Sequence, residues 1–435
     1  MSRQSILGLV LVLTVASASA RAQVPLSIRT GQAPLSLRAA LDEALTENLT
    51  LVALRRQFDA QRLRPGAERF LDPPTFEAQI WQWPLTTLNP LDTNMYMFTV
   101  RQDIPGRGKR ALRSAVLEKE AEQASNEIAM RAREVINQVK QAYADLFVSR
   151  QAIAVHQASA DLLGQTINLM TVRYGAGHGA QQDVLKTVAE IAKLHTDLVM
   201  LQERADLAAV RLNTLMNREP GAPIGELAAD RDDNAIPPVE SLHRLALEQH
   251  PEFRAAQLDV ERADAALAVA NGNDKPDFMV GGGYQLMPRS AGAWTATVGL
   301  TWPNAPWSRG RLDAAKAEAV AAIAAAKAQQ QAVAAAIASA IQHAYVRATA
   351  ANARASLLRE SVIPQTRQVF ESARIAYQSD RGDAAAVVEN QRMLLDVQLD
   401  YYRALSDLQQ ARADLERAVG TDLPTPVQVA SQETR

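Results

Sequence analysis

The spacing of apolar and polar residues changes several times along the chain and predicts two kinds of element. Two stretches, about 107–173 and 308–376, are rich in Ala, Glu, Gln, Arg and Leu and almost free of proline, so each predicts one very long helix. At 1.5 Å per residue, such a helix is about 100 Å long, far more than the diameter of a compact domain. Four shorter helices are predicted at about 37–70, 182–217, 241–272 and 384–419.

Between the helices the period falls to two, which predicts strands. The clearest segment runs from Trp294 to Trp302, where aromatic and aliphatic side chains alternate with Thr and Gly. Its length suits a tilted strand that crosses a bilayer, which needs about 9–11 residues. Three other segments show a similar apolar face: Phe76, Ala78 and Ile80; Tyr96, Phe98 and Val100; and Phe278, Val280, Tyr284 and Leu286.

The order of these elements repeats after about 202 residues, which indicates a tandem duplication. The repeat is carried by matched landmarks: Ala44–Asn48 with Ala246–His250, Pro74 and Phe76 with Pro276 and Phe278, Gly108 with Gly310, Tyr143 with Tyr345, and Tyr174 and Gly179 with Tyr377 and Gly382. We therefore divide the chain into a signal peptide (1–22), a first repeat (23–217), a linker (218–240), a second repeat (241–420) and a C-terminal tail (421–435).

The first residues have the pattern of a secretory signal peptide. Arg3 precedes an apolar run over 6–16, and Ala18-Ser19-Ala20 and Ala20-Arg21-Ala22 are both small-x-small cleavage sites. The alternative is an N-terminal anchor, although the run is short for a bilayer. Because the chain has no cysteine, we expect neither a disulfide nor a lipid anchor.

Composition and motifs predict no chemistry. The formal net charge of −2 gives no basic field for nucleic acid, and the six histidines show no metal-ligand spacing. Gly106 to Arg110 lacks the glycine spacing of a phosphate-binding loop. We therefore expect no catalytic residue, no cofactor, no bound metal and no nucleic-acid partner.

The five tryptophans all lie between helices, which favours a membrane protein over a soluble rod. Trp81, Trp83, Trp294 and Trp302 are predicted to mark the membrane–water interfaces. Four strands cannot close a barrel and an open edge is not tolerated in lipid, so three copies would supply twelve strands. A coiled-coil rod and a soluble hairpin packed on helices remain the alternatives.

Two short turns between the long helices carry a family resemblance. The first, Arg173-Tyr174-x-x-Gly177, is followed by Asp183-Val184-Leu185, and the second, Tyr377 to Gly382, is followed by 387–392. With the duplicated layout, these segments resemble the TolC-like outer-membrane efflux channels over about 36–420. The resemblance implies a mainly α fold with a trimeric twelve-stranded membrane β-barrel and a periplasmic helical barrel. It also implies a passive, non-enzymatic channel in outer-membrane lipid that works with a periplasmic adaptor and an inner-membrane pump.

The resemblance also suggests roles for the turns. Residues expected at the adaptor-docking tips are Arg173, Tyr174, Gly177, His178, Gly179, Tyr377, Arg381 and Gly382. Asp380 and Asp383 are expected to form a constriction, with Arg173 or Arg381 as ion-pair partners, although Asp380 replaces the glycine of the first turn. An ordinary helix–helix turn is the alternative at both places.

The substrate stays open at this point. The run from Gln102 to Arg110 is similar to the strand-exit motif of the heavy-metal branch of the family; the alternative is a strand end with solvated basic residues. Two other kinds of protein remain as hypotheses, a periplasmic adaptor or coiled-coil scaffold and a soluble enzyme with a helical accessory domain.

Overall fold

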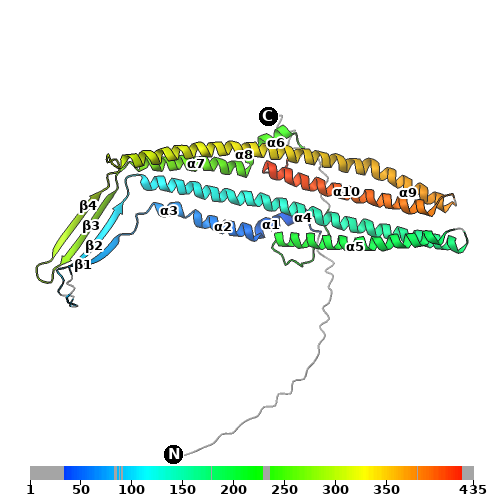
Figure 1. Cartoon of the computed structure of the whole chain (residues 1–435), viewed down its shortest axis with the longest axis horizontal. Coiled ribbons are helices and arrows are strands. Elements are labelled where there is room, and N and C mark those ends of the chain that lie inside the picture. The colour runs from blue at the N-terminus through cyan, green and yellow to red at the C-terminus, as the bar shows by residue number, and fades with distance from the viewer. Residues whose placement is uncertain are drawn as a thin grey trace, which may run out of the picture.

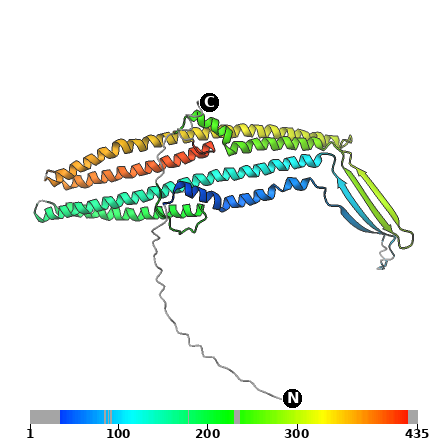
Figure 2. The same cartoon turned by 180° about the vertical axis from the view of Figure 1, so that it is seen from behind.

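The chain forms a long helical body with a sheet at one end and two hairpin tips at the other (Figure 1). The computed structural model describes residues 34–82, 86–87, 89, 92–177, 179–228, 236–379 and 381–423. The sheet is inclined to the helices, and both tips lie at the far end of the body, as the view from behind also shows (Figure 2). Among the described residues, none of the helices has the length and apolarity needed to cross a membrane.

Both repeats contain the same series of elements. The first repeat comprises α1 (Leu37–Glu47), α2 (Leu49–Gln61), α3 (Arg64–Glu68), β1 (Thr75–Trp81), β2 (Met95–Ile104), α4 (Lys109–Gly175) and α5 (Gln181–Leu215). The second comprises α6 (Val239–Gln249), α7 (Pro251–Gly272), β3 (Phe278–Leu286), β4 (Ala293–Leu300), α8 (Arg309–Leu357), the π-helix η2 (Leu358–Val362), α9 (Ile363–Gln378) and α10 (Ala384–Val419).

Three predicted helices are interrupted, and each interruption has a local cause. The predicted helix over 37–70 breaks at Asn48 and again after Gln61, and that over 241–272 breaks at His250. Asn48 and His250 both leave the helical backbone conformation, and each caps the helix that follows. The predicted helix over 308–376 contains the π-turn η2, which ends two residues before Pro364, whose missing N–H cannot continue the helical ladder. The single helices predicted in these three places are therefore wrong in detail.

Each long helix runs the length of the body and changes partners near the middle. Near the sheet, α2 and α3 pack on α4 and α7 packs on α8; near the tips, α5 lies beside α4 and α10 beside α9 (Figure 1). One core cluster joins α1, α2, α4 and α5 around the fully buried Leu51, Val139 and Leu212. A second joins α6, α8 and α10 around Leu242, Ile341 and Leu415. The two repeats thus bury equivalent mid-body cores.

The four strands form one antiparallel sheet in the order β1-β2-β3-β4. The central pair β2–β3 joins the two repeats, with Phe98 opposite Tyr284. The predicted apolar face of β4 is confirmed, since Trp294, Val298 and Leu300 are all exposed. The predicted end at Trp302 is wrong: β4 ends at Leu300, because Pro303 cannot donate to a further rung of the ladder.

The run from Gln102 to Arg110 connects the sheet to the helical body. Gly106 lies so close to the second repeat that a Cβ there would be 2.5 Å from the Pro276 carbonyl oxygen, and Gly108 adopts φ +87°. The Lys109 ammonium is buried and lies 2.8 Å from the Asp277 carboxylate, which also accepts from the Gly106 N–H at 2.7 Å. The alternative of basic residues solvated at the strand end is therefore wrong for Lys109, because its side chain holds the two repeats together.

Candidate functional site at the helical tips

The first tip is a short turn between α4 and α5. The Ala176 N–H donates to the Val172 carbonyl at 3.1 Å, and the Gly177 N–H donates to the Tyr174 carbonyl at 3.0 Å. Gly177 adopts φ +80°, which a side chain would strain, and no atom lies within 4 Å of the position of a Cβ. The glycine is therefore required for its backbone conformation rather than for space. His178 lies outside the described residues.

The second tip closes with different interactions. The Arg381 N–H donates to the Ala376 carbonyl at 2.9 Å, and a Cβ at Gly382 would be 2.9 Å from the Tyr377 nitrogen. Asp383 caps α10, because its carboxylate accepts from the Ala385 N–H at 3.3 Å. Asp380 lies outside the described residues. This turn needs glycine for close backbone packing, unlike the first.

Arg173 joins the two tips. Its guanidinium donates to the Tyr377 backbone carbonyl at 2.5 Å and lies over the Tyr377 ring, with 4.6 Å between the guanidinium carbon and the ring centroid. The contact combines a charge-assisted hydrogen bond with a cation–π interaction. Because Arg173 belongs to the last turn of α4 and Tyr377 to the last turn of α9, it connects the ends of the two hairpins.

The two repeat-related tyrosines occupy opposite environments. Tyr174 is 45% exposed, whereas Tyr377 is only 7% exposed. Burial raises the pKa of the Tyr377 hydroxyl, with Asp183 and Asp383 adding to the rise and Arg173 opposing it. The second tip therefore has an aromatic side chain packed inside the body where the first tip presents one at the surface.

A hydrophobic cluster behind the tips supports this arrangement, and the sequence reasoning did not single it out. Its buried members come from both hairpins: Met170 of α4, Phe370 and Tyr377 of α9, and Ala384, Val387 and Leu394 of α10. Thr187 of α5 is fully buried beside them, and its hydroxyl donates to the Asp183 carbonyl at 2.8 Å. In the sequence, only the helical spacing of these apolar residues indicated that they are buried, and this spacing does not show that four helices meet at one cluster.

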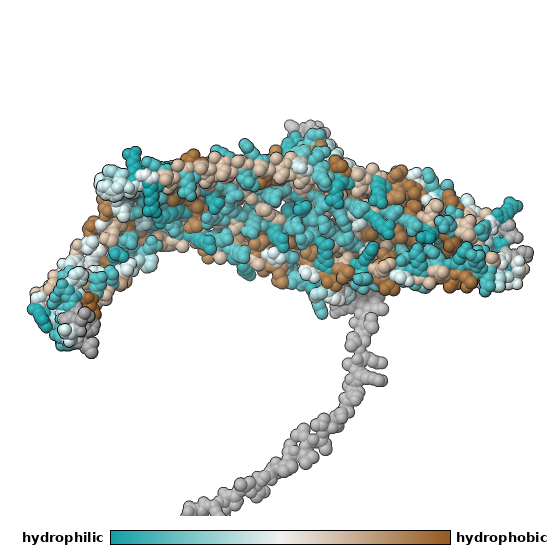
Figure 3. Space-filling model, viewed as in Figure 1, coloured by the Kyte–Doolittle hydropathy of each residue, from teal (hydrophilic) through white to brown (hydrophobic). Residues whose placement is uncertain are grey.

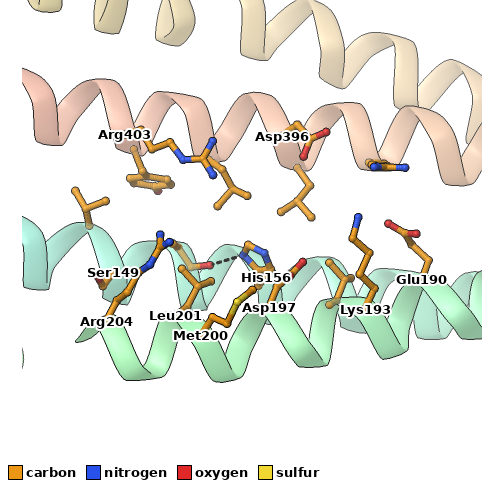
Figure 4. Close-up of a pocket in the computed structure, with 17 residues that line it drawn as sticks. Ser149, His156, Glu190, Lys193, Asp197, Met200, Leu201, Arg204, Asp396 and Arg403 are labelled. Carbon is orange, nitrogen blue, oxygen red and sulfur yellow. Dashed lines mark hydrogen bonds between the residues drawn. The ribbon is translucent and has the colours of Figure 1, made fainter. Parts of the chain in front are cut away.

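Above the tips, α4, α5 and α10 line a cleft of about 280 Å³ (Figure 4). Charged side chains of both signs surround it, among them Lys193, Asp197 and Arg403. His156 is buried at its floor, with Nδ1 3.0 Å from the Ala152 carbonyl oxygen. No group of three or more metal-binding side chains occurs among the residues that the structure describes.

At the opposite end, three of the predicted interface tryptophans are exposed. Trp294 is 83%, Trp302 64% and Trp81 50% exposed, while Trp83 lies outside the described ranges. Trp294 packs against Tyr284 with 5.0 Å between ring centroids, and Trp302 meets Trp307 edge-on at 6.1 Å. Aromatic side chains thus gather on the sheet and at its helical end.

Two tandem helical hairpins end together, opposite a four-stranded sheet that exposes aromatic and aliphatic side chains, and this architecture is that of an outer-membrane channel. The chain belongs to the outer membrane efflux protein family, whose model matches residues 40–218 and 242–421. It is thus an outer-membrane efflux channel that extends into the periplasm, and it is not an enzyme.

Individual relatives are distant in sequence but cover most of the chain. The cobalt-zinc-cadmium resistance protein CzcC of Cupriavidus metallidurans is 23% identical over 403 residues, which are 91% of this chain and 93% of CzcC. The structure of the outer membrane protein VceC from Vibrio cholerae matches with a TM-score of 0.70 at 19% identity, covering 89% of this chain and 97% of VceC. The MtrE channel of Neisseria gonorrhoeae matches with a TM-score of 0.70 at 18% identity, covering 89% and 90%. The mainly helical fold with a small strand portion is confirmed.

Proposed function

We propose that three copies of this chain form one continuous conduit, the outer-membrane part of a tripartite efflux system. The observation that carries the proposal is the amount of apolar surface that a single chain leaves uncovered, on the sheet and on the helices alike. A monomeric soluble protein rarely exposes such surface, and a trimer in a membrane would cover it with lipid and with neighbouring subunits.

The sheet supports assembly through its edges. Within the described residues, β1 and β4 each pair with one strand only, so each leaves a row of backbone donors and acceptors without a sheet partner. Such groups are costly in lipid, whereas pairing β4 of one copy with β1 of the next would satisfy them. Three copies would then give a closed cylinder of twelve strands, with the exposed Phe76, Phe98 and Val298 facing lipid.

The helical body supports assembly through α5. Five of its exposed apolar residues fall within one sector of the helix: Leu185, Val188, Val199, Leu207 and Val210. Figure 3 shows further hydrophobic patches over the tip half of the body, where Val369, Ile375 and Met393 are exposed. A stripe of this kind on a surface helix matches the packing face of a neighbouring helix.

The two tips are the proposed docking sites for a periplasmic adaptor, through which an inner-membrane pump would deliver the substrate. The proposed contact residues for the adaptor are those of the two turns: Arg173, Tyr174, Gly177, His178, Gly179, Tyr377, Arg381 and Gly382. In a trimer, Asp380 and Asp383 would form acidic rings that attract cations. Replacing both aspartates by alanine should lower cation selectivity and change conductance in planar bilayers; unchanged values would remove this role.

Heavy-metal cations are the proposed substrate class. The support is the near full-length similarity to CzcC, whose name states resistance to cobalt, zinc and cadmium. Deletion of the gene should sensitise cells to divalent metal ions and leave their tolerance of organic toxicants unchanged. Broad sensitivity to organic toxicants would contradict the metal assignment while leaving the conduit intact.

Assembly has its own test in a matched pair of variants on α5. Leu207→Glu replaces an exposed apolar residue of that sector by a carboxylate, whereas Lys186→Glu places a carboxylate on an exposed position of the same helix outside it. The first should abolish a heat-sensitive trimer in outer-membrane fractions, and the second should preserve it. A soluble periplasmic monomer in the wild type would refute the conduit altogether.

A further inference from the structure

The same structural position is occupied by Asn48 in the first repeat and by His250 in the second. Each residue ends one short helix and begins the next, with ψ angles of 118° and 122°. In both repeats the residue lies at mid-body, where the helix that it starts meets the C-terminal end of the helix returning from the tip. The two residues can therefore be compared as equivalent joints.

Asn48 makes the first joint with both ends of its amide. Its Oδ1 accepts from the Thr50 N–H at 3.1 Å and caps α2, and its Nδ2 donates to the Leu215 carbonyl at 3.0 Å. Leu215 is the last residue of α5, so one side chain connects the start of α2 to the end of α5. An amide does not titrate, and this joint is the same at every physiological pH.

His250 makes the second joint with one ring nitrogen and with close packing. Its Nδ1 accepts from the Glu252 N–H at 3.1 Å and caps α7, and its ring lies against the end of α10, where a Cβ at Gly420 would be 2.9 Å from the His250 Cδ2. Nδ1 must be unprotonated to accept, so the proton resides on Nε2. Arg417, which borders the same cleft as His250, follows Leu215 by the same displacement that separates His250 from Asn48, so the two joints occupy equivalent positions.

The surroundings hold this ring in place and disfavour its charged form. Gly420, at φ +84°, packs so closely that a Cβ there would be 2.7 Å from the His250 Cα, and Pro251 fixes the chain at the first position of α7. Burial lowers the pKa of His250, and the Arg417 charge adds to that effect while Glu252 opposes it. The ring is therefore neutral in the folded protein at neutral pH.

The joint borders a cleft of about 650 Å³, and charged side chains of α4, α7 and α10 also line this cleft. Beside Glu252 of α7 and Arg417 of α10, α4 contributes Glu127, Arg131, Arg133 and Glu134. The lining residues of α2 and α8 are uncharged: Thr50, Leu54, Ala336, Ile337 and Ala340. Glu134 pairs with Arg417 at 3.9 Å, and His250 is the histidine among the lining residues, the side-chain type whose charge ordinarily changes between pH 5 and 8.

We propose that His250 is a proton-operated joint that releases the start of α7 from the end of α10 in acid, while Asn48 keeps the equivalent joint of the first repeat closed. Protonation places a hydrogen on Nδ1, where it meets the Glu252 N–H instead of accepting from it. The new positive charge also lies at a helix N-terminus, where the helix dipole repels it. The loss of the cap loosens the second hairpin at its mid-body end and leaves the first unchanged.

Hydrogen exchange measured by mass spectrometry on the full-length protein in detergent tests this proposal. Peptides that cover the first turns of α7 and α2 are compared at about pH 7.5 and about pH 4.5, after correction for intrinsic exchange; the lower value lies well below the ordinary histidine pKa because burial lowers the pKa of His250. At the lower pH, the α7 peptide should lose about fivefold in protection, which is the typical effect of one lost N-cap on local opening. Equal corrected protection of α7 at both pH values would overturn the proposal.

Three variants make the test specific. His250→Asn copies the first joint and should abolish the pH response of α7, and Asn48→His should transfer a response to α2. His343→Asn removes an exposed histidine of α8 and should leave the α7 response intact. A response of α7 that persists in His250→Asn would assign the effect to other groups and refute the role of His250. The wild-type protein alone compares α7 with α2 at two pH values, so the proposal can be tested even if a variant fails to fold.

Discussion

Replacement of Arg173 by methionine should make the tips of the channel open more often. Methionine keeps most of the aliphatic stem but removes the guanidinium that donates to the Tyr377 carbonyl and covers the Tyr377 ring. The contact connects α4 to α9 at their last turns, so its loss frees the two hairpin ends to move apart.

The magnitude follows from the two parts of the contact. A hydrogen bond from a charged donor contributes about 1.5–3 kcal/mol, and the lower end applies because the Ser379 N–H also reaches the Tyr377 carbonyl. The cation–π interaction adds about 0.5–1 kcal/mol at a partly exposed site. The sum of about 2 kcal/mol per chain corresponds to a change of about thirtyfold in the ratio of closed to open tips.

Single-channel recording of the purified protein in planar bilayers measures this ratio directly. Arg173→Met should shorten closed dwell times or raise the mean conductance, and Arg173→Lys should give an intermediate result because lysine keeps the charge but not the planar fork. Arg367→Met is the matched control, since Arg367 is an exposed residue of α9 with no ion pair among the described residues. If Arg173→Met and Arg367→Met both behave like the wild type, the Arg173–Tyr377 contact does not hold the tips together.

Three further predictions concern the body of the molecule and are read by thermal unfolding. Lys109→Met should destabilise the fold by about 2–3 kcal/mol, because it leaves the Asp277 carboxylate without its buried partner. Gly106→Ala should cost about 1–3 kcal/mol, since its Cβ would meet backbone at 2.5 Å, whereas Gly164→Ala within α4 meets no atom within 4 Å and should stabilise by about 0.5–1 kcal/mol. Burial raises the pKa of Asp145, so the fold binds its proton more tightly than the unfolded chain does, and this carboxyl opposes folding at neutral pH. Asp145→Asn should therefore stabilise the protein at pH 7, and the gain should vanish as the pH falls through the raised pKa of the wild-type carboxyl.

The Lys109 prediction has a control at the same junction, and the Asp145 prediction is checked by its pH dependence. Lys275→Met removes an exposed lysine whose ammonium donates to the Arg107 carbonyl, and it should cost less than Lys109→Met. Equal costs would mean that burial of the Lys109–Asp277 pair does not set the energy. A stability gain in Asp145→Asn that persists in acid would show that the effect does not come from ionisation of Asp145.

The elements themselves could be predicted because their causes are local. Long runs of helix-forming residues led to α4 and α10, whose observed bounds lie within two residues of the expected ones, and period-two alternation led to the exposed face of β4. Prediction was poorer where a single side chain determines whether a helix continues or ends. Asn is a favoured N-cap and Pro251 suits the first position of a helix, but the prediction followed the helix-forming runs around them; in the structure Asn48 and His250 each cap a new helix through the side chain.

The tip turns were found from sequence, but their chemistry was not. Glycines in a break between two long helices indicated Gly177 and Gly382, and both have a structural reason for lacking a side chain. Tyr174 and Tyr377 occupy matching positions in the sequence repeat, although Tyr174 is exposed and Tyr377 is buried in the structure. Their difference arises from the packing of α9 and α10 against α4, which the two local sequences do not encode.

By itself, the sequence determined the duplication, the lengths of the helices and the outward face of the strands, because propensity and periodicity act within one element at a time. Only the tertiary structure decided which residues of one repeat meet the other, as Arg173 meets Tyr377 and Lys109 meets Asp277. Those contacts join residues far apart in the chain, and they depend on how each helix is rotated and shifted against its neighbours. Side-chain packing along the whole body sets that rotation, so no single segment contains the information.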